Sequence, residues 1–156
     1  MKIILDTNIY ISSFAFDSHV ENFYLEILKK DEIDIYFSDE TFNELVKKLD
    51  LNEFSSILAK SKRLIGRVDV DGFIQNIKVN SIIISDPLEK VTICRDPNDN
   101  KFLELAKAIK ADYIISGDKD LLELGDFEGV VILKPGEFLQ EIGIWFMNII
   151  KPNIKY

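Results

Sequence analysis

The chain has 156 residues, 47% of them hydrophobic and 11% aromatic, and its formal net charge is −8 at pH 7. This length and apolar content suit one core, and we expect a single domain over residues 1–156. One cysteine, Cys94, excludes an internal disulfide, and together with one histidine, His19, it leaves no set for a Cys/His zinc site. If the chain is an enzyme, carboxylates must do the chemistry.

The sequence shows no signal for a membrane or for export. Its longest apolar stretch, IGIWFMNII near the C-terminus, is well short of the roughly 20 residues that a membrane span needs. The opening run MKIILDTN has neither the length nor the pattern of a signal or transit peptide. We therefore expect a cytoplasmic protein without a membrane partner.

Short apolar runs alternate with helical patterns along the whole chain. The runs predict buried strands at residues 2–5, 34–37, 81–85, 112–116 and 129–133. Helices are predicted at about residues 8–15, 20–30, 39–50, 53–66, 69–79, 98–110 and 135–148. Strands buried on both faces and separated by helices are typical of a parallel sheet, so we expect an α/β layer fold.

The first predicted strand ends at Asp6, and the strand at 112–116 is followed by Asp118. The carboxyl ends of parallel strands face the crevice where such sheets bind ligands, so these two aspartates could converge. Asp6 opens the run DTN, whose residues all cap helices well, and a simple N-cap is an equally good explanation of Asp6.

The helix predicted at 39–50 has an apolar stripe from Phe42 to Leu49 at spacings of three and four. Glu44 falls about opposite this stripe. Periodicity therefore places Glu44 on the surface, where it could pair with Lys48 one turn further on.

A basic run follows in AKSKRLIGR, and it is the one candidate for a surface that tracks phosphates. A solvated helix face explains the same run, and a net charge of −8 is the wrong sign for binding nucleic acid by bulk electrostatics. The basic residues concerned are Lys60, Lys62, Arg63 and Arg67.

Asp99 occupies an informative position in the helix predicted at 98–110. If Asp96 caps this helix, Asp99 falls at its third position, on the same line as Phe102 and Ala106, which points the carboxylate toward the inside. Asp99 could be a capping-box partner for the amide of Asp96, or it could be a metal ligand. The pattern does not separate these two roles.

Clustered acids become useful when they hold hard divalent cations. Mg²⁺ takes oxygen ligands and commonly binds through one or two carboxylates plus substrate phosphate. A pair of such ions roughly 4 Å apart can activate a water and stabilise the leaving oxygen during phosphodiester cleavage. This chemistry needs neither histidine nor cysteine.

Four ordered blocks of the sequence together resemble the PIN domain family, and within it the toxin components of toxin-antitoxin pairs. The blocks are MKIILDTNIYIS, SDETFNEL, RDPNDNKFLELAKAIKADYIISGDKDLL and GVVILKPGEFL. The resemblance implies a Rossmann-like α/β/α sandwich with a central, mainly parallel sheet. It also implies cleavage of RNA that depends on Mg²⁺ or Mn²⁺, a homodimer and a cognate antitoxin as protein partner.

The resemblance also implies roles for individual residues. The family's four acids, catalytic and metal-binding, map onto Asp6, Glu44, Asp99 and Asp118. Asp120 is a further acid at the metal, and the polar positions that brace the carboxylates map onto Thr7, Asn8 and Ser116. This mapping lifts Glu44 out of the surface position that periodicity assigns to it.

Residues 143–156 extend past the point where the family usually ends, and they include Trp145 and Phe146. This apolar extension could pack on its own core, or it could contact a second copy or an antitoxin.

Three other functions compete with the ribonuclease. The chain could be a catalytically silent PIN-fold module that binds RNA or protein. A topoisomerase-primase domain would need a glutamate where Asp6 stands, and a haloacid-dehalogenase phosphatase would need an aspartate where Asn8 stands. Both of these enzyme alternatives therefore fail at a named residue.

Overall fold

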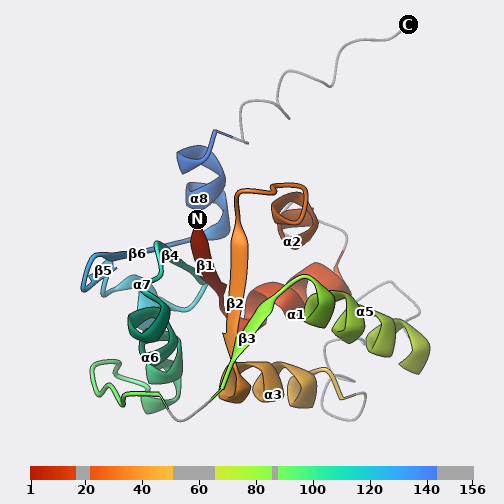
Figure 1. The fold of residues 1–156 in the computed structure, drawn as a ribbon, viewed down its shortest axis with the longest axis horizontal. Coiled ribbons are helices and arrows are strands. Elements are labelled where there is room, and N and C mark those ends of the chain that lie inside the picture. The colour runs from red at the N-terminus through yellow and green to blue at the C-terminus, as the bar shows by residue number, and fades with distance from the viewer. Residues whose placement is uncertain (17–21, 51–65, 86–87, 144–156) are drawn as a thin grey trace, which may run out of the picture.

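A computed structural model describes residues 1–16, 22–50, 66–85 and 88–143. Its centre is a six-stranded sheet in the order β3-β2-β1-β4-β6-β5 (Figure 1). Neighbouring strands run parallel except for the pair β5 and β6, which is antiparallel. The strands are β1 (Lys2–Leu5), β2 (Asp34–Ser38), β3 (Ile82–Ile84), β4 (Tyr113–Ile115), β5 (Asp126–Phe127) and β6 (Val130–Leu133).

All five predicted strands are present, and the mainly parallel sheet is confirmed. The two-residue strand β5 was not predicted. It pairs with β6 across a tight turn in which Glu128 and Gly129 both have positive φ, of 51° and 86°. A strand this short leaves no alternating pattern to recognise.

The helices follow the predicted order. They are α1 (Thr7–Ala15), α2 (Asn22–Ile27), α3 (Asp39–Lys48), α5 (Arg67–Val79), the 3₁₀ turn η1 (Pro97–Asp99), α6 (Asn100–Ile109), α7 (Lys119–Leu122) and α8 (Pro135–Glu141). The short helix α7 was not predicted, and the helix predicted from residue 98 begins as the 3₁₀ turn. The helix predicted at 53–66 lies almost entirely outside the described residues, and so does the extension after residue 143.

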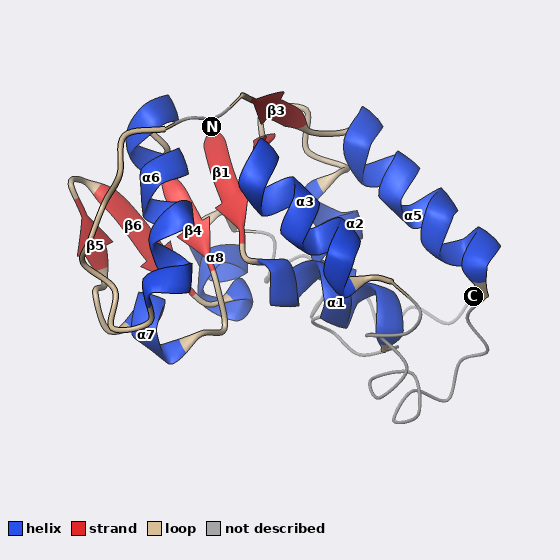
Figure 2. Ribbon diagram, turned by 90° about the horizontal axis from the view of Figure 1, so that it is seen from below, coloured by secondary structure: helices blue, strands red, loops and turns tan. Residues whose placement is uncertain are grey.

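Alternation along β1 divides the interior into two layers. Ile3 and Leu5 belong to one cluster of buried residues, which packs against α1, α2, α3, α5 and α8. Ile4, between them, belongs to a second cluster with the apolar face of α6. Successive side chains of a strand point to opposite faces, so helices cover both faces and the fold is an α/β/α sandwich. Figures 1 and 2 show α6 on one side of the strands and α1, α3 and α5 on the other.

No helix in the described ranges is long and apolar enough to span a bilayer.

Candidate active site

The ends of β1 and β4 bring Asp6 and Ser116 together. These strands are parallel neighbours with Leu5 opposite Ile115, so the residues that follow them meet at one edge of the sheet. The amide of Asp6 donates to the carbonyl of Ile115 at 2.9 Å, and the Ser116 hydroxyl donates to Oδ2 of Asp6 at 2.7 Å. Residues far apart in sequence are thereby fixed to each other.

Asp6 is both a helix cap and a cleft residue, so the two explanations offered by the sequence hold together. Its Oδ1 accepts a hydrogen bond from the amide of Asn8 at 3.3 Å, which caps α1. Its side chain is only 4% exposed. Burial raises the pKa of Asp6, although the hydrogen bonds from Ser116 and Asn8 favour its ionised form. Thr7, the next residue, is buried at the start of α1.

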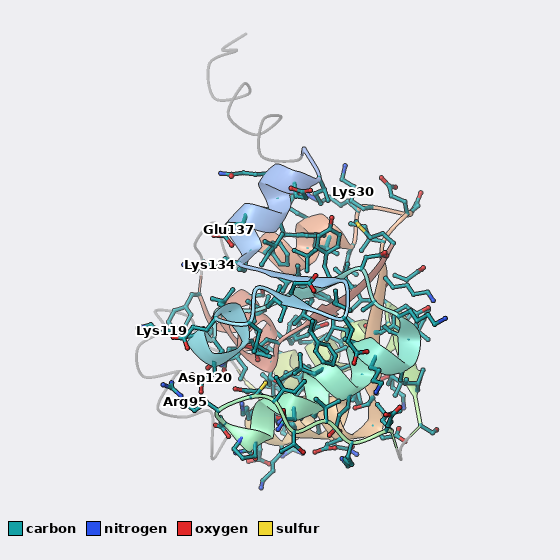
Figure 3. The ribbon with its side chains drawn as sticks, turned by 90° about the vertical axis from the view of Figure 1, so that its left-hand side faces the viewer. Lys30, Arg95, Lys119, Asp120, Lys134 and Glu137 are labelled. Atoms are coloured by element: carbon teal, nitrogen blue, oxygen red, sulfur yellow. The ribbon has the colours of Figure 1, made fainter. Side chains whose placement is uncertain are left out.

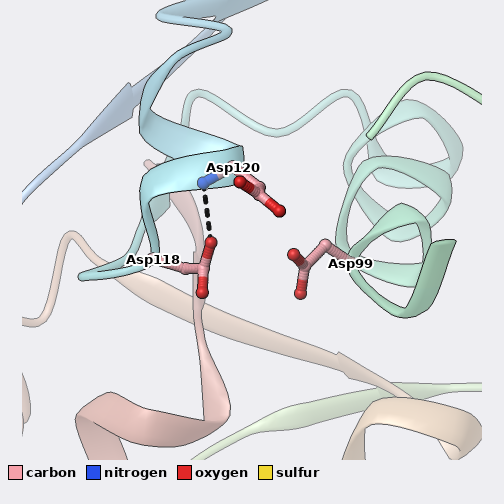
Figure 4. Close-up of side chains that lie close together, drawn as sticks. All are labelled: Asp99, Asp118 and Asp120. Carbon is pink, nitrogen blue, oxygen red and sulfur yellow. Dashed lines mark hydrogen bonds between the residues drawn. The ribbon is translucent and has the colours of Figure 1, made fainter. Parts of the chain in front are cut away.

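Three aspartates gather just beyond the end of β4. One carboxylate oxygen each of Asp99, Asp118 and Asp120 lies within 4.8 Å of the others (Figure 4). Asp118 caps the short helix α7, where its Oδ1 accepts from the amide of Asp120 at 2.7 Å. The amide of Asp118 donates to the Ser116 hydroxyl at 2.9 Å, which connects this group to Asp6.

Asp99 lies where η1 meets α6, and its environment disfavours its charge. Burial, followed by the negative charges of Asp118, Asp96 and Asp6, raises the pKa of Asp99 to about 6. Capping of η1 falls to Asp96, whose Oδ1 accepts from the amide of Asn98 at 2.9 Å. Asp99 itself is the N-cap of α6, but its side chain makes no capping hydrogen bond there.

Glu44 lines the same cleft from α3, where it is half-buried and not on the fully exposed surface where periodicity placed it. Its side chain is 21% exposed, and both of its oxygens are paired. Oε1 lies 2.7 Å from Nζ of Lys48, as the sequence predicted, and Oε2 forms an ion pair with Lys101. Burial alone would raise the pKa of Glu44, but the hydrogen bonds from Lys101 and Lys48 outweigh it and lower that pKa.

These side chains surround one cleft of about 430 Å³. Its lining residues are Asp6, Asn8, Glu44, Lys48, Asp96, Asn98, Asp99, Lys101, Phe102 and Asp118. The four acids that the family resemblance assigned as catalytic are all among them.

Asp120 lies close to Asp99 and Asp118 and forms an ion pair with a basic residue. Arg95 forms an ion pair with it through its guanidinium group, and the two residues lie beside each other in Figure 3. The Arg95 side chain is 78% exposed. This ion pair therefore contributes little to stability, but it places a positive charge at the rim of the acidic group.

The predicted basic run does not join this site within the part of the chain that the structure describes. Lys60, Lys62 and Arg63 lie outside the described residues. Arg67 begins α5, where its Nε lies 3.8 Å from Oδ1 of Asp71. It lines a separate hollow with Val46 and Val70.

Sequence reasoning missed the residues that hold the loop before Asp99. Asn100 is 5% exposed, and its Oδ1 accepts from the amides of Ile93 and Cys94 at 3.0 and 2.9 Å. Glu104, one turn further on, is also buried and accepts from the amide of Val91 at 3.1 Å. The sequence did carry a signal for these residues. Asn100 and Glu104 are polar, are four residues apart and fall on the buried side of an amphipathic helix.

The chain is similar to a protein of known sequence and to a protein family. The chain is 28% identical over 126 residues to the uncharacterized protein MJ1680 of Methanocaldococcus jannaschii, an alignment that covers 81% of this chain and 76% of that protein. Residues 2–120 match the PIN domain family, a span that includes every acid of the cleft. A match over this much of the chain, on a parallel sheet with acids at the ends of β1 and β4, shows that the chain belongs to the PIN domain family.

Proposed function

We propose that this protein is a ribonuclease that hydrolyses RNA phosphodiester bonds with the help of Mg²⁺ or Mn²⁺. PIN domains are generally nucleases and bind RNA, and this family membership supports a nuclease reaction. The observation that supports the metal-dependent chemistry most directly is the grouping of Asp99, Asp118 and Asp120, with oxygen atoms within 4.8 Å of one another.

The donor set fits a hard divalent cation. All three side chains offer carboxylate oxygens, which are the ligands that Mg²⁺ and Mn²⁺ prefer. Their crowding is unfavourable without a cation, since burial and then the neighbouring acids raise the pKa of Asp99. Asp99, Asp118 and Asp120 would hold the metal, and Asp6 lines the same cleft as Asp99 and Asp118. When bound, the metal would supply an activated water and stabilise charge on the scissile phosphate.

The chain's own residues would orient these acids. Ser116 holds Asp6 through its hydroxyl and accepts from the amide of Asp118, so one side chain fixes two acids. Asn8 holds the other oxygen of Asp6. Hydrolysis at this site would leave a 5′-phosphate and a 3′-hydroxyl.

The surface beside the acids offers cations for an RNA strand. Lys119 and Lys134 line a hollow of about 280 Å³. Gly117, the residue before Asp118, also lines it. Figure 3 shows Lys134, Lys119 and Arg95 along the same side of the molecule. These cations support RNA as the substrate in spite of the net charge of −8.

The experiment is cleavage of 5′-labelled single-stranded RNA with Mg²⁺, Mn²⁺ or EDTA. The parent protein should cut RNA only with metal, and Asp99→Asn and Asp118→Asn should lose the activity. Asp31→Asn, which changes an exposed aspartate in a turn, is the matched control and should cut like the parent. Identical background in all samples, together with absent Mn²⁺ binding by calorimetry, would instead favour a silent module that binds RNA or protein.

We also propose that this activity serves as the toxin of a toxin-antitoxin pair, on the strength of the sequence resemblance. Induced expression in a bacterial host should arrest growth, and Asp118→Asn should abolish the arrest. Growth arrest that persists in Asp118→Asn would count against a toxin that acts through this site.

A further inference from the structure

Glu44 is already engaged by two cations. Lys48 is one turn along the same helix, and such i,i+4 pairs are common on helix surfaces. Lys101 comes from a different helix, α6. Its ion pair with Glu44 joins two residues that both line the cleft.

The side chain of Lys101 is more buried than is usual for a lysine. Its side chain is only 11% exposed, whereas that of Lys48 is 42% exposed. Its Nζ lies 5.4 Å from the centre of the Phe102 ring, and its charge favours the ionised form of Asp99. Lysine is seldom this buried without a partner, and here Glu44 supplies one. Glu44 therefore holds an ammonium group at a fixed place in the cleft.

The cleft is lined mostly by acidic side chains, so an ammonium group in it could help to bind an anionic substrate. Among the described residues, five carboxylates line the cleft against two ammonium groups, those of Lys48 and Lys101. A phosphodiester that enters an acidic cleft needs positive charge close by, and a pre-positioned lysine is a common phosphate-binding group.

We propose that Lys101 binds the RNA phosphate next to the metal-holding acids, and that Glu44 is the positioning residue for Lys101 rather than a ligand of the metal. This inference rests on the proposed function, since it takes RNA as the substrate. It differs from the role that the family resemblance gives to Glu44, because both oxygens of Glu44 are committed to lysines.

A purely structural role is the alternative, because the Lys101–Glu44 ion pair also ties α6 to α3. The experiment therefore measures RNA binding and metal binding separately. Labelled single-stranded RNA is titrated by fluorescence anisotropy with Ca²⁺ in place of Mg²⁺, and a denaturing gel checks that the RNA stays intact. Mn²⁺ binding is measured by calorimetry without RNA, and the melting temperature of every variant is recorded.

The variants are Lys101→Met, Lys101→Arg and Glu44→Gln, with Lys107→Met as the control. Lys107 is on the same helix, but it pairs with the exposed Glu89. Lys101→Met should bind RNA at least about tenfold more weakly, as expected for a lost charge-assisted hydrogen bond. The plot of the logarithm of the RNA association constant against the logarithm of the salt concentration should become less steep, by about 0.7 in slope. Lys101→Arg keeps the charge and should retain most of the affinity, and Lys107→Met should bind like the parent.

Glu44→Gln should weaken RNA binding because Lys101 loses its anchor, while Mn²⁺ affinity should fall far less than in Asp118→Asn, because Glu44 is outside the group of Asp99, Asp118 and Asp120. Three results would overturn the inference: parental RNA affinity in Lys101→Met, loss of Mn²⁺ binding in Glu44→Gln to the level of Asp118→Asn, or no RNA binding by the parent. A parent that binds RNA through Lys101 but cleaves none with any metal would defeat the nuclease proposal and leave this inference standing.

Discussion

The Ser116 hydroxyl donates a 2.7 Å hydrogen bond to Oδ2 of Asp6, and both side chains are buried. The bond joins the residue after β4 to the residue after β1, and the same hydroxyl accepts from the amide of Asp118. The geometry of two acids therefore depends on one small side chain. No pattern in the sequence predicts this bond directly, although the parallel pairing of the two strands makes it feasible.

Replacing Ser116 with alanine should destabilise the protein. The buried carboxylate of Asp6 would lose its closest donor, and we expect a loss of about 1.5–3 kcal/mol in the free energy of unfolding at pH 7.5. Burial already raises the pKa of Asp6, and the substitution should raise it further. The loss should therefore shrink as the pH falls and Asp6 takes up a proton.

Urea unfolding of Ser116→Ala at pH 7.5 and 4.5 measures this effect. Ser12→Ala, at a half-buried serine of α1, is the control and should change stability little at either pH. An equal loss at both pH values would show that Ser116 acts through packing and not through the charge of Asp6.

Much of the fold could be predicted from the sequence because its signals are local. Apolar β-branched runs gave the five main strands, and the stripe from Phe42 to Leu49 gave α3. The strand β5 and the helix α7 escaped because they are too short for periodicity to show. They depend on single local features, the turn at Gly129 and the cap at Asp118, and not on a repeating pattern.

The site could be predicted only in part. Asp6 and Asp118 follow strands, so parallel topology alone suggests that they meet. Glu44 needed the family resemblance, because a residue opposite the stripe of its own helix can still face a neighbouring helix, as it does toward α6. The partners Lys101 and Arg95 could not be predicted, since both ion pairs join segments whose separation depends on the whole fold.

Asp99→Asn should stabilise the metal-free protein at neutral pH. The pKa of Asp99 is raised to about 6 in the folded state, above its ordinary value of 3.8, so ionising Asp99 opposes folding. This cost is absent below about pH 4, grows as the pH rises, and is complete above about pH 6. After allowance for solvent screening of a partly exposed group, we expect a gain of about 1 kcal/mol at pH 7.5.

The measurement for Asp99 is urea unfolding in EDTA between pH 4.5 and 8. The stability gain of Asp99→Asn should rise from pH 4.5 to just above the folded pKa of about 6 and then level off, and Asp31→Asn should give no such trend. A gain that is independent of pH, or a loss at pH 7.5, would contradict the repulsion among these acids.

Arg95→Gln should tighten metal binding. The guanidinium group of Arg95 is paired with Asp120, so a metal ion that binds there must compete with it. An exposed ion pair is worth about 0.2–1 kcal/mol, and the Mn²⁺ dissociation constant should therefore fall by up to about fivefold. Calorimetry measures it, with Arg67→Gln as a control at a second exposed arginine paired with an aspartate. Weaker Mn²⁺ binding in Arg95→Gln would mean that Arg95 supports the metal site.

Asn100→Ala should loosen the loop that precedes Asp99. The substitution leaves the buried amide of Cys94 and the partly buried amide of Ile93 without their acceptor, and we expect a loss of about 2–4 kcal/mol in the free energy of unfolding. The same loop leads to Asp96 and Asp99, so RNA cleavage should fall as well.

Cys94 provides a local reporter of this loop, because it is the only cysteine of the chain and is buried. Burial and nearby aspartates raise the pKa of its thiol to about 11, so it should react slowly with a disulfide reagent at pH 8. Asn100→Ala should accelerate that reaction under conditions where most molecules remain folded, whereas Asn80→Ala, at an exposed residue that ends α5, should not. Slow Cys94 labelling in a destabilised Asn100→Ala would show that the stability lost is global and that the loop keeps its local structure.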